Sequence, residues 1–191
     1  YAQNVKSKTY YIKGVVMKKI LLILLISFIA KPDYSAIGLE LAKGGDIDYT
    51  TLSFDQVNPK FKVSTVVARA EAFGNSSTGQ GLGFSYAFEN FNEGSFYVGV
   101  AYARREAFGE TESDTGAAFG YAKASGEGLD FDLSITDDTN VSIGVTQWFE
   151  DGFGLGAGVL FPDDERLDTT IGITLSYKLS LIHISEPTRP T

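Results

Sequence analysis

The sequence predicts an all-β fold, an antiparallel transmembrane β-barrel of about ten strands. Large apolar residues recur at every second position, whereas the positions between them are mostly Gly, Ala and Ser. A period of two indicates strands, because successive side chains point to opposite faces. Most alternating segments have nine to twelve residues, close to the ~9–11 of a tilted membrane-spanning strand. Strands of soluble proteins are typically ~5–6 residues long.

The first element is a predicted signal peptide at residues 17–36. Met17 is followed by two lysines and by an apolar run of eleven residues, 20–30. A small-residue site follows at Ser35 and Ala36, which completes the three-part pattern of an export signal. Eleven apolar residues are too few for a membrane-spanning helix, which needs ~20.

The two ends of the chain are expected to lie outside the fold. Residues 1–16 precede Met17 and are expected to be leader sequence, and residues 179–191, "LSLIHISEPTRPT", resemble a translated sequencing-library adapter. We therefore expect the barrel to occupy residues 37–178, with the gene cut near Lys178. That segment contains 9 Lys and Arg against 22 Asp and Glu, a net charge of −13. Such an acidic chain offers no basic stripe for nucleic acid, and the absence of Cys excludes disulfide and thiolate chemistry.

Ten alternating segments follow the signal peptide. They are expected at 35–43, 46–54, 61–72, 80–89, 95–105, 115–124, 128–136, 140–149, 152–161 and 168–178. Eight strands result if 35–54 is irregular, and twelve if the gene is truncated. The connections after the third, fifth and ninth segments look longer and polar, whereas those after the sixth and eighth are tight, as in barrels with long external loops and short turns.

The alternation separates the outward and inward faces of some predicted strands more clearly than those of others. The pair at 80–89 and 95–105 flanks an Asn/Glu/Gly turn, with its bulk on one face and small residues on the other. The ninth segment places glycines between its apolar residues, and as a helix its three glycines at 154, 156 and 158 would each cost ~1 kcal/mol relative to Ala. The residues predicted to face lipid are Leu82, Phe84, Tyr86, Phe88, Phe96, Val98, Val100, Tyr102, Phe131, Ile143, Ile171, Ile173 and Leu175.

The same alternation places charged residues inside the barrel. The candidates for the lumen are Glu40, Arg69, Glu71, Arg105, Asp130 and Asp132. They could line a passage that favours cations, with Arg105 paired to a carboxylate such as Asp132. Alternatively they form a salt-bridge network that fills a narrow barrel. Aromatic residues near strand ends are predicted to form a girdle at the membrane interface: Trp148, Phe149, Tyr121 and Tyr177.

Together, the signal peptide, the ten alternating segments, the acidic connections and the lack of Cys resemble a small bacterial outer-membrane β-barrel of the OmpA/OmpX-like or porin-like superfamily. A YfaZ-like protein is one possibility. The resemblance covers residues 37–178 and implies the outer membrane of a Gram-negative bacterium, with lipids and the barrel-assembly machinery as partners.

The chemistry predicted for this chain is not enzymatic. The single His is His183, within the predicted adapter, so residues 37–178 cannot assemble a histidine-dependent triad. Asp130 and Asp132 could serve glycoside hydrolysis, but nothing else suggests a sugar cleft. No cofactor and no metal site are expected. The predicted role is passive passage of small solutes or ions through a narrow lumen, or a structural or surface role. The alternative is a secreted soluble β-sandwich that binds a ligand.

Overall fold

The structure is a computed structural model that describes residues 32–107, 110–164 and 167–179. Within these ranges the chain forms ten strands: β1 (Tyr34–Gly44), β2 (Ile47–Val57), β3 (Phe61–Ala72), β4 (Asn75–Ala87), β5 (Ser95–Ala107), β6 (Glu110–Lys123), β7 (Leu129–Thr136), β8 (Val141–Trp148), β9 (Phe153–Phe161) and β10 (Thr170–Leu179). None of the described segments is a helix of the length and apolar character that crossing a membrane requires. The predicted leader and most of the predicted signal peptide and adapter, residues 1–31 and 180–191, lie outside the described residues. Tyr34 to Ala36 of the predicted signal peptide and Leu179 of the predicted adapter are part of β1 and β10, so the described barrel is slightly longer than the predicted 37–178.

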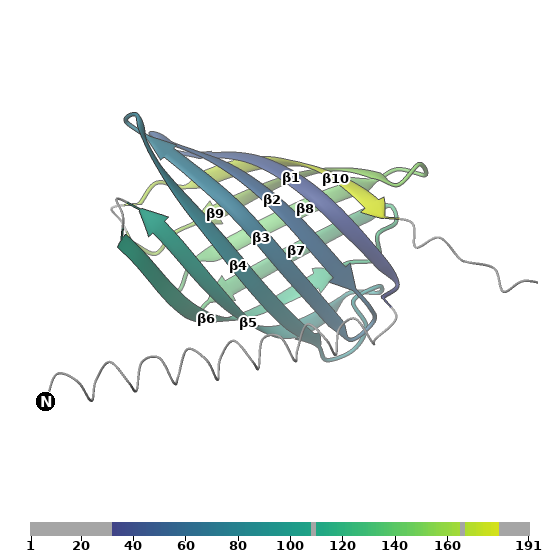
Figure 1. The fold of residues 1–191 in the computed structure, drawn as a ribbon. Coiled ribbons are helices and arrows are strands. Elements are labelled where there is room, and N and C mark those ends of the chain that lie inside the picture. Colours follow the sequence, from purple (N-terminus) through teal and green to yellow (C-terminus); the bar gives the residue numbers. More distant parts are fainter. Residues whose placement is uncertain (1–31, 108–109, 165–166, 180–191) are drawn as a thin grey trace, which may run out of the picture. The chain divides into compact units, whose positions relative to one another are not determined.

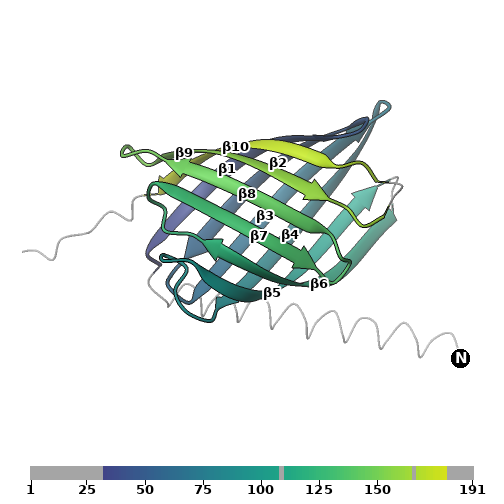
Figure 2. The ribbon, with the colours of Figure 1, turned by 180° about the vertical axis from the view of Figure 1, so that it is seen from behind.

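Every strand pairs with its neighbours in the sequence, and the last strand pairs with the first (Figures 1 and 2). All the pairings are antiparallel, and the β1–β10 ladder runs from Ser35 opposite Leu179 to Gly44 opposite Thr170. The sheet therefore closes on itself and leaves no free edge. The predicted ten-stranded antiparallel barrel is confirmed.

Two strands begin earlier than the alternation predicts. β4 begins at Asn75 rather than near residue 80, and β6 begins at Glu110 rather than near residue 115. The predicted long connections after the third and fifth strands are wrong. Only residues 108 and 109 separate β5 from β6, and only Phe73 and Gly74 separate β3 from β4. Both have positive φ, 50° and 78°, as a two-residue hairpin turn requires. The apolar alternation stops where both faces of a strand meet water, but the backbone ladder continues.

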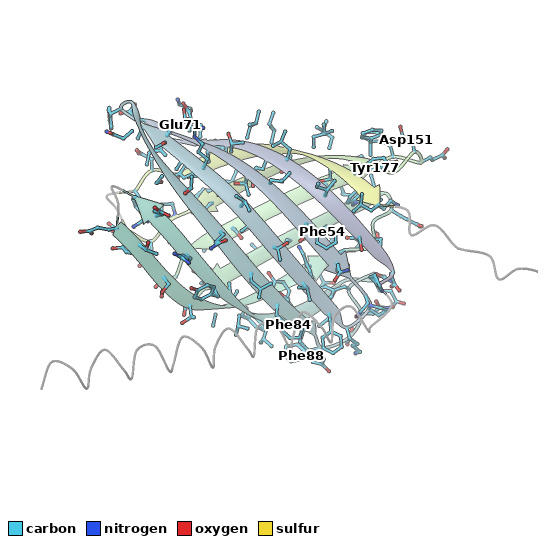
Figure 3. The ribbon with its side chains drawn as sticks, viewed as in Figure 1. Phe54, Glu71, Phe84, Phe88, Asp151 and Tyr177 are labelled. Carbon is cyan, nitrogen blue, oxygen red and sulfur yellow. The ribbon has the colours of Figure 1, made fainter. Side chains whose placement is uncertain are left out.

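The outer face of the barrel is apolar around its whole circumference. Residues paired across a ladder share a face, and Phe84, Val100 and Ala117 are successive partners on the outer one. Val100 is 59% exposed and Ile171 60%. Figure 3 shows Phe84, Phe88 and Tyr177 on this face. The strand register places the residues predicted to face lipid in the outward series, except Phe88, which follows the end of β4 and is 52% exposed.

Buried residues gather at one end of the interior. The barrel has an end at the connections β2–β3, β4–β5, β6–β7 and β8–β9, and an opposite end at the other five connections. The apolar core cluster, which includes Val57, Phe91 and Tyr97, lies at the first of these ends. We call it the plugged end, and the opposite end the open end.

Candidate functional site: the lumen

The half of the lumen nearest the open end is hollow. Ala101 and Ala103 face inward from β5, opposite Gly83 and Gly81, yet both are exposed. A Cβ added at the inward-facing Gly144 would meet nothing within 4 Å. Small side chains therefore leave space that water can enter from the open end.

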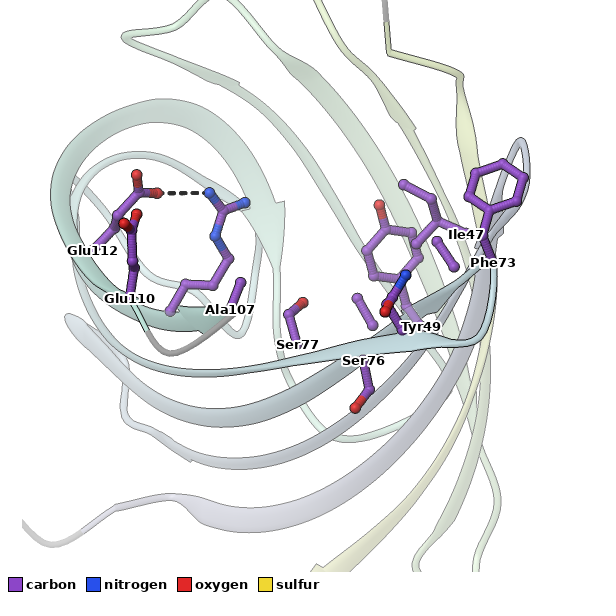
Figure 4. Close-up of a pocket in the computed structure, with 12 residues that line it drawn as sticks. Ile47, Tyr49, Phe73, Ser76, Ser77, Ala107, Glu110 and Glu112 are labelled. Carbon is purple, nitrogen blue, oxygen red and sulfur yellow. Dashed lines mark hydrogen bonds and ion pairs between the residues drawn. The ribbon is translucent and has the colours of Figure 1, made fainter.

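A cavity of about 510 Å³ forms the mouth at the open end (Figure 4). Glu110 and Glu112 of β6 lie on one side of it, and Tyr49 of β2 and Phe73 lie on the other. Arg105 of β5 donates a hydrogen bond from Nη2 to Glu112 Oε2 at 2.7 Å, and the two side chains are 65% and 69% exposed. The predicted pairing of Arg105 with Asp132 is therefore wrong, because a carboxylate on the neighbouring strand satisfies the guanidinium at the mouth.

Because its ion pair is solvated, we expect Arg105 to contribute little to stability. Exposed ion pairs are worth about 0–1 kcal/mol. Arg105→Ala and the outward-facing variant Arg104→Ala should therefore have free energies of unfolding within about 1 kcal/mol of each other, as measured by urea titration in lipid vesicles. A loss several times larger for Arg105→Ala alone would mean that Arg105 is anchored deep in the barrel.

The plugged end is closed by aromatic side chains and by the β4–β5 connection, residues 88–94. Phe91 from that connection is 1% exposed and packs on the Tyr97 ring, with 5.8 Å between centroids. Its backbone N donates to Pro59 O at 2.9 Å, and its carbonyl accepts from Ala124 N at 2.8 Å. Tyr34 and Trp148 meet edge to face at 5.9 Å. The described residues thus fill this end of the lumen with packed side chains.

Asp130 of β7 holds the β6–β7 connection beneath this seal. Its carboxylate accepts hydrogen bonds from Ser125 N, Ser125 Oγ, Gly126 N and Trp148 Nε1, at 2.7–2.8 Å. Lys178 Nζ donates to the Gly126 carbonyl at 2.6 Å and lies 5.7 Å from the centroid of the Trp148 ring. Asp130 is 6% exposed, so its charge is stabilised by four donors rather than by water. This arrangement fixes the connection and leaves the carboxylate no free role.

A second cavity, of about 250 Å³, lies inside the barrel next to Tyr34 and Trp148. Its inward-facing charged lining residues are Glu40, Asp55, Lys62, Asp130 and Asp132, whereas Lys123, which also borders it, belongs to the outward series. Asp132 Oδ1 accepts a hydrogen bond from the Tyr97 hydroxyl at 3.2 Å, and Asp55 accepts one from Ser64 Oγ. The Asp55 carboxylate is also the strongest electrostatic neighbour of Lys62. The cavity is polar, with more carboxylates than ammonium groups along its inner wall.

Two glycines make room for the large side chains at the plugged end. A Cβ at Gly154 would come within 2.8 Å of the Trp148 ring, and one at Gly120 within 2.7 Å of the Tyr97 ring. These rings lie over glycines of the neighbouring strands, which explains why bulky aromatic residues fit inside a narrow barrel. Gly144 also faces inward but has open space above it.

The contrast between these glycines gives a test of the packing. Gly154→Val should displace Trp148 and lower the free energy of unfolding by about 1–3 kcal/mol, the usual cost of overpacking. Gly144→Val should cost much less, because its side chain would enter the hollow part of the lumen. The check is urea unfolding of both variants in vesicles, and equal losses would contradict the placement of Trp148.

The register also shows where the other predicted site residues lie. Glu40 and Arg105 face inward, like Asp130 and Asp132. Arg69 and Glu71 instead lie on the outer face near the open end, because they share the series of Leu52 and Val67. They form an exposed ion pair at 2.6 Å. The alternation of β3 carries both outward, so they are not part of the lumen.

The predicted girdle aromatics fall into two groups. Tyr121, Phe149 and Tyr177 lie in the outward series near the plugged end, where Tyr121 stacks on Phe131 and Tyr177 packs on Phe153. Trp148 does not belong to this group. It faces inward opposite Gly154 and is 7% exposed, because its indole N–H binds the buried Asp130.

Several lumen residues were missed by the sequence reasoning. Asp55, Lys62 and Lys178 face inward. Each directly follows an outward aromatic residue, Phe54, Phe61 or Tyr177, so the strand alternation could have predicted that it faces inward. Phe91 carried no such signal, because it is a lone aromatic in a polar connection.

Comparison with known proteins finds structural likeness only. No family model matches the sequence, and no curated protein matches it. The chain is similar to the N-terminal β-barrel domain of Pseudomonas aeruginosa OprF, with 9% identity, a TM-score of 0.44, and coverage of 78% of this chain and 98% of that one. It is also similar to a KdgM porin, with 13% identity, a TM-score of 0.45, and coverage of 75% of this chain and 99% of that one. A third similar structure is the Yersinia pestis outer membrane protein Ail in a phospholipid nanodisc, with 14% identity, a TM-score of 0.41, and coverage of 78% of this chain and 100% of that one. These TM-scores lie below 0.5, so the description of this barrel rests on its own strand pairing.

Proposed function

We propose that this chain is an integral β-barrel protein of the outer membrane of a Gram-negative bacterium. The observation that carries the proposal is the inverted distribution of side chains. Large apolar residues are exposed on the outer face, whereas the inner face holds small and polar ones. In water such a surface would favour association, because soluble monomers rarely expose large contiguous apolar patches. In a bilayer the same surface is covered by lipid, and the closed ladder leaves no backbone group of a strand edge unpaired.

The soluble β-sandwich does not describe this chain. A sandwich has two sheets that bury their apolar faces against each other, whereas these ten strands form a single closed sheet with its apolar face outward. The aromatic residues of the outer face near the plugged end, including Tyr86, Tyr121 and Tyr177, support a position at a membrane interface.

The packing at the plugged end favours a structural or surface role over passage. Phe91, Val57 and Tyr97 are at most 6% exposed and fill the plugged end. A lumen that is hollow at one end and sealed at the other does not connect the two sides of a membrane. The proposed role is therefore that of a membrane-anchored barrel that presents its open, acidic end, with lipids as its surroundings and the barrel-assembly machinery as its insertion partner.

The proposal includes no catalysis. The two inward carboxylates considered for it already bind protein donors, Asp130 through four hydrogen bonds and Asp132 through the Tyr97 hydroxyl. Asp130 is 6% exposed and surrounded by its four donors, so it is not placed like a general acid in an accessible cleft.

The experiment that tests the membrane role is refolding from urea, with and without phospholipid vesicles. We expect the protein to float with the vesicles in a density gradient and to acquire β-structure only in lipid or detergent. A folded, monomeric protein in buffer alone would overturn the proposal. In planar bilayers the inserted parent protein should pass no ionic current, and steady open currents would contradict the sealed lumen.

A further inference from the structure

We propose that residues 88–94 form a removable plug, and that displacing them opens a cation-conducting path through the barrel. The proposal rests on the membrane location proposed above. It assigns the chain a second, latent activity in addition to its structural role.

The first step of the argument is that the plug is not part of the barrel wall. The β4–β5 ladder ends at Ala87 opposite Tyr97, and the described closure of the sheet uses no pairing from residues 89–94. The connection is held to the rest of the chain by backbone bonds of Phe91 to Pro59 and Ala124. Two side-chain bonds also hold it, from Asn92 Nδ2 to Asp33 Oδ2 at 2.7 Å and from Lys60 Nζ to Phe88 O at 3.0 Å. Moving residues 89–94 therefore breaks no bond of the β4–β5 ladder, whose last backbone bond runs from Phe88 N to Phe96 O at 3.0 Å.

The second step concerns what lies beside the plug. Phe91 packs on Tyr97, and the Tyr97 hydroxyl reaches Asp132, which lines the inner cavity of about 250 Å³. Beyond it, the inward-facing residues of β4 and β5 before Arg105 are small: Gly81, Gly83, Gly99, Ala101 and Ala103. Phe91 of the plug thus fills the cross-section beside Tyr97, whereas Tyr34 and Trp148 line the inner cavity from the strands and stay in place when the plug moves.

The third step is the charge of the path. The inward carboxylates are those of Glu40, Asp55, Glu110, Glu112, Asp114, Asp130 and Asp132. The inward cations on the strands are Lys62, Arg105 and Lys178, and two of these are bound to Glu112 and to the Gly126 carbonyl. An excess of fixed negative charge in a narrow lumen raises the local concentration of cations. Small monovalent cations are therefore the class of solute that an opened barrel should pass.

The test is single-channel recording in planar bilayers under a KCl gradient. Phe91→Gly should convert the silent parent into a conducting protein, with a reversal potential of the sign set by K⁺. Phe149→Gly is the matched control, because Phe149 lies in another connection at the same end but is 52% exposed on the outer face, and it should stay silent. Adding Glu40→Gln to Phe91→Gly should move the reversal potential toward zero.

A second variant covers the case in which Phe91→Gly does not fold. Asn92→Ala keeps every apolar group of the plug and removes only its bond to Asp33, so it should show brief openings. Insertion of each variant is scored separately by vesicle flotation. If inserted Phe91→Gly and Asn92→Ala are both silent, the plug proposal is overturned while the membrane role stands. If the parent itself fails to insert, the membrane role fails. Anion selectivity would overturn the assigned charge of the path.

Discussion

Asp130→Ala should produce the largest loss of stability in the barrel, a decrease of roughly 3–5 kcal/mol in the free energy of unfolding. Removing the carboxylate leaves Ser125 N, Gly126 N and Trp148 Nε1 without an acceptor. Each buried donor without a partner costs about 1–3 kcal/mol. The β6–β7 connection and the Trp148 ring should then lose their fixed positions together, because one side chain holds both.

The matched control is Asp132→Ala, two residues along the same strand face. Asp132 accepts one hydrogen bond, from the Tyr97 hydroxyl at 3.2 Å, so its removal should cost only about 1 kcal/mol. Urea unfolding in vesicles, followed by gel mobility and by the fluorescence of the single Trp, measures both effects. If Asp132→Ala were as destabilising as Asp130→Ala, the network around Asp130 would not be the anchor described here.

Val100→Arg should have the second large effect, by hindering insertion into bilayers. Val100 is 59% exposed in the middle of the outward series of β5. An arginine near the bilayer midplane of a barrel costs about 2–4 kcal/mol. Folding yield in vesicles should fall sharply. The same substitution at the inward neighbour, Ala101→Arg, should be tolerated better, because its side chain enters the water-accessible part of the lumen. Equal folding of Val100→Arg and the parent would contradict a lipid-facing surface.

The alternation of large and small residues predicted most of the barrel wall. It predicted ten strands and the outward series, because in a closed sheet the two faces of a strand meet different surroundings. It failed where that contrast ends. Asn75 and Glu110 lie in strands that extend beyond the apolar band, so their polarity suggested loops although the backbone stays paired.

The interior was harder to predict, because several of its features depend on contacts between distant segments. Trp148 occurs beside a turn, which is typical of an interface aromatic, and only the position of Asp130 draws its indole inward. Phe91 closes the lumen through contacts with Pro59 and Ala124, which are 32 and 33 residues away in the sequence. A period of two says which face a strand residue takes, but it says nothing about a connection that folds back into the barrel.

The measurement that tests the central claim most directly compares the two faces of one strand. The chain contains no Cys, so Val100→Cys and Ala101→Cys each introduce a unique thiol. In vesicles, a small water-soluble methanethiosulfonate reagent should modify Cys at position 101, which faces the hollow lumen. It should leave position 100 protected by lipid, and in urea both thiols should react alike. Equal modification of the two positions in vesicles, or faster modification at position 100, would contradict a membrane-spanning barrel with its apolar face in lipid.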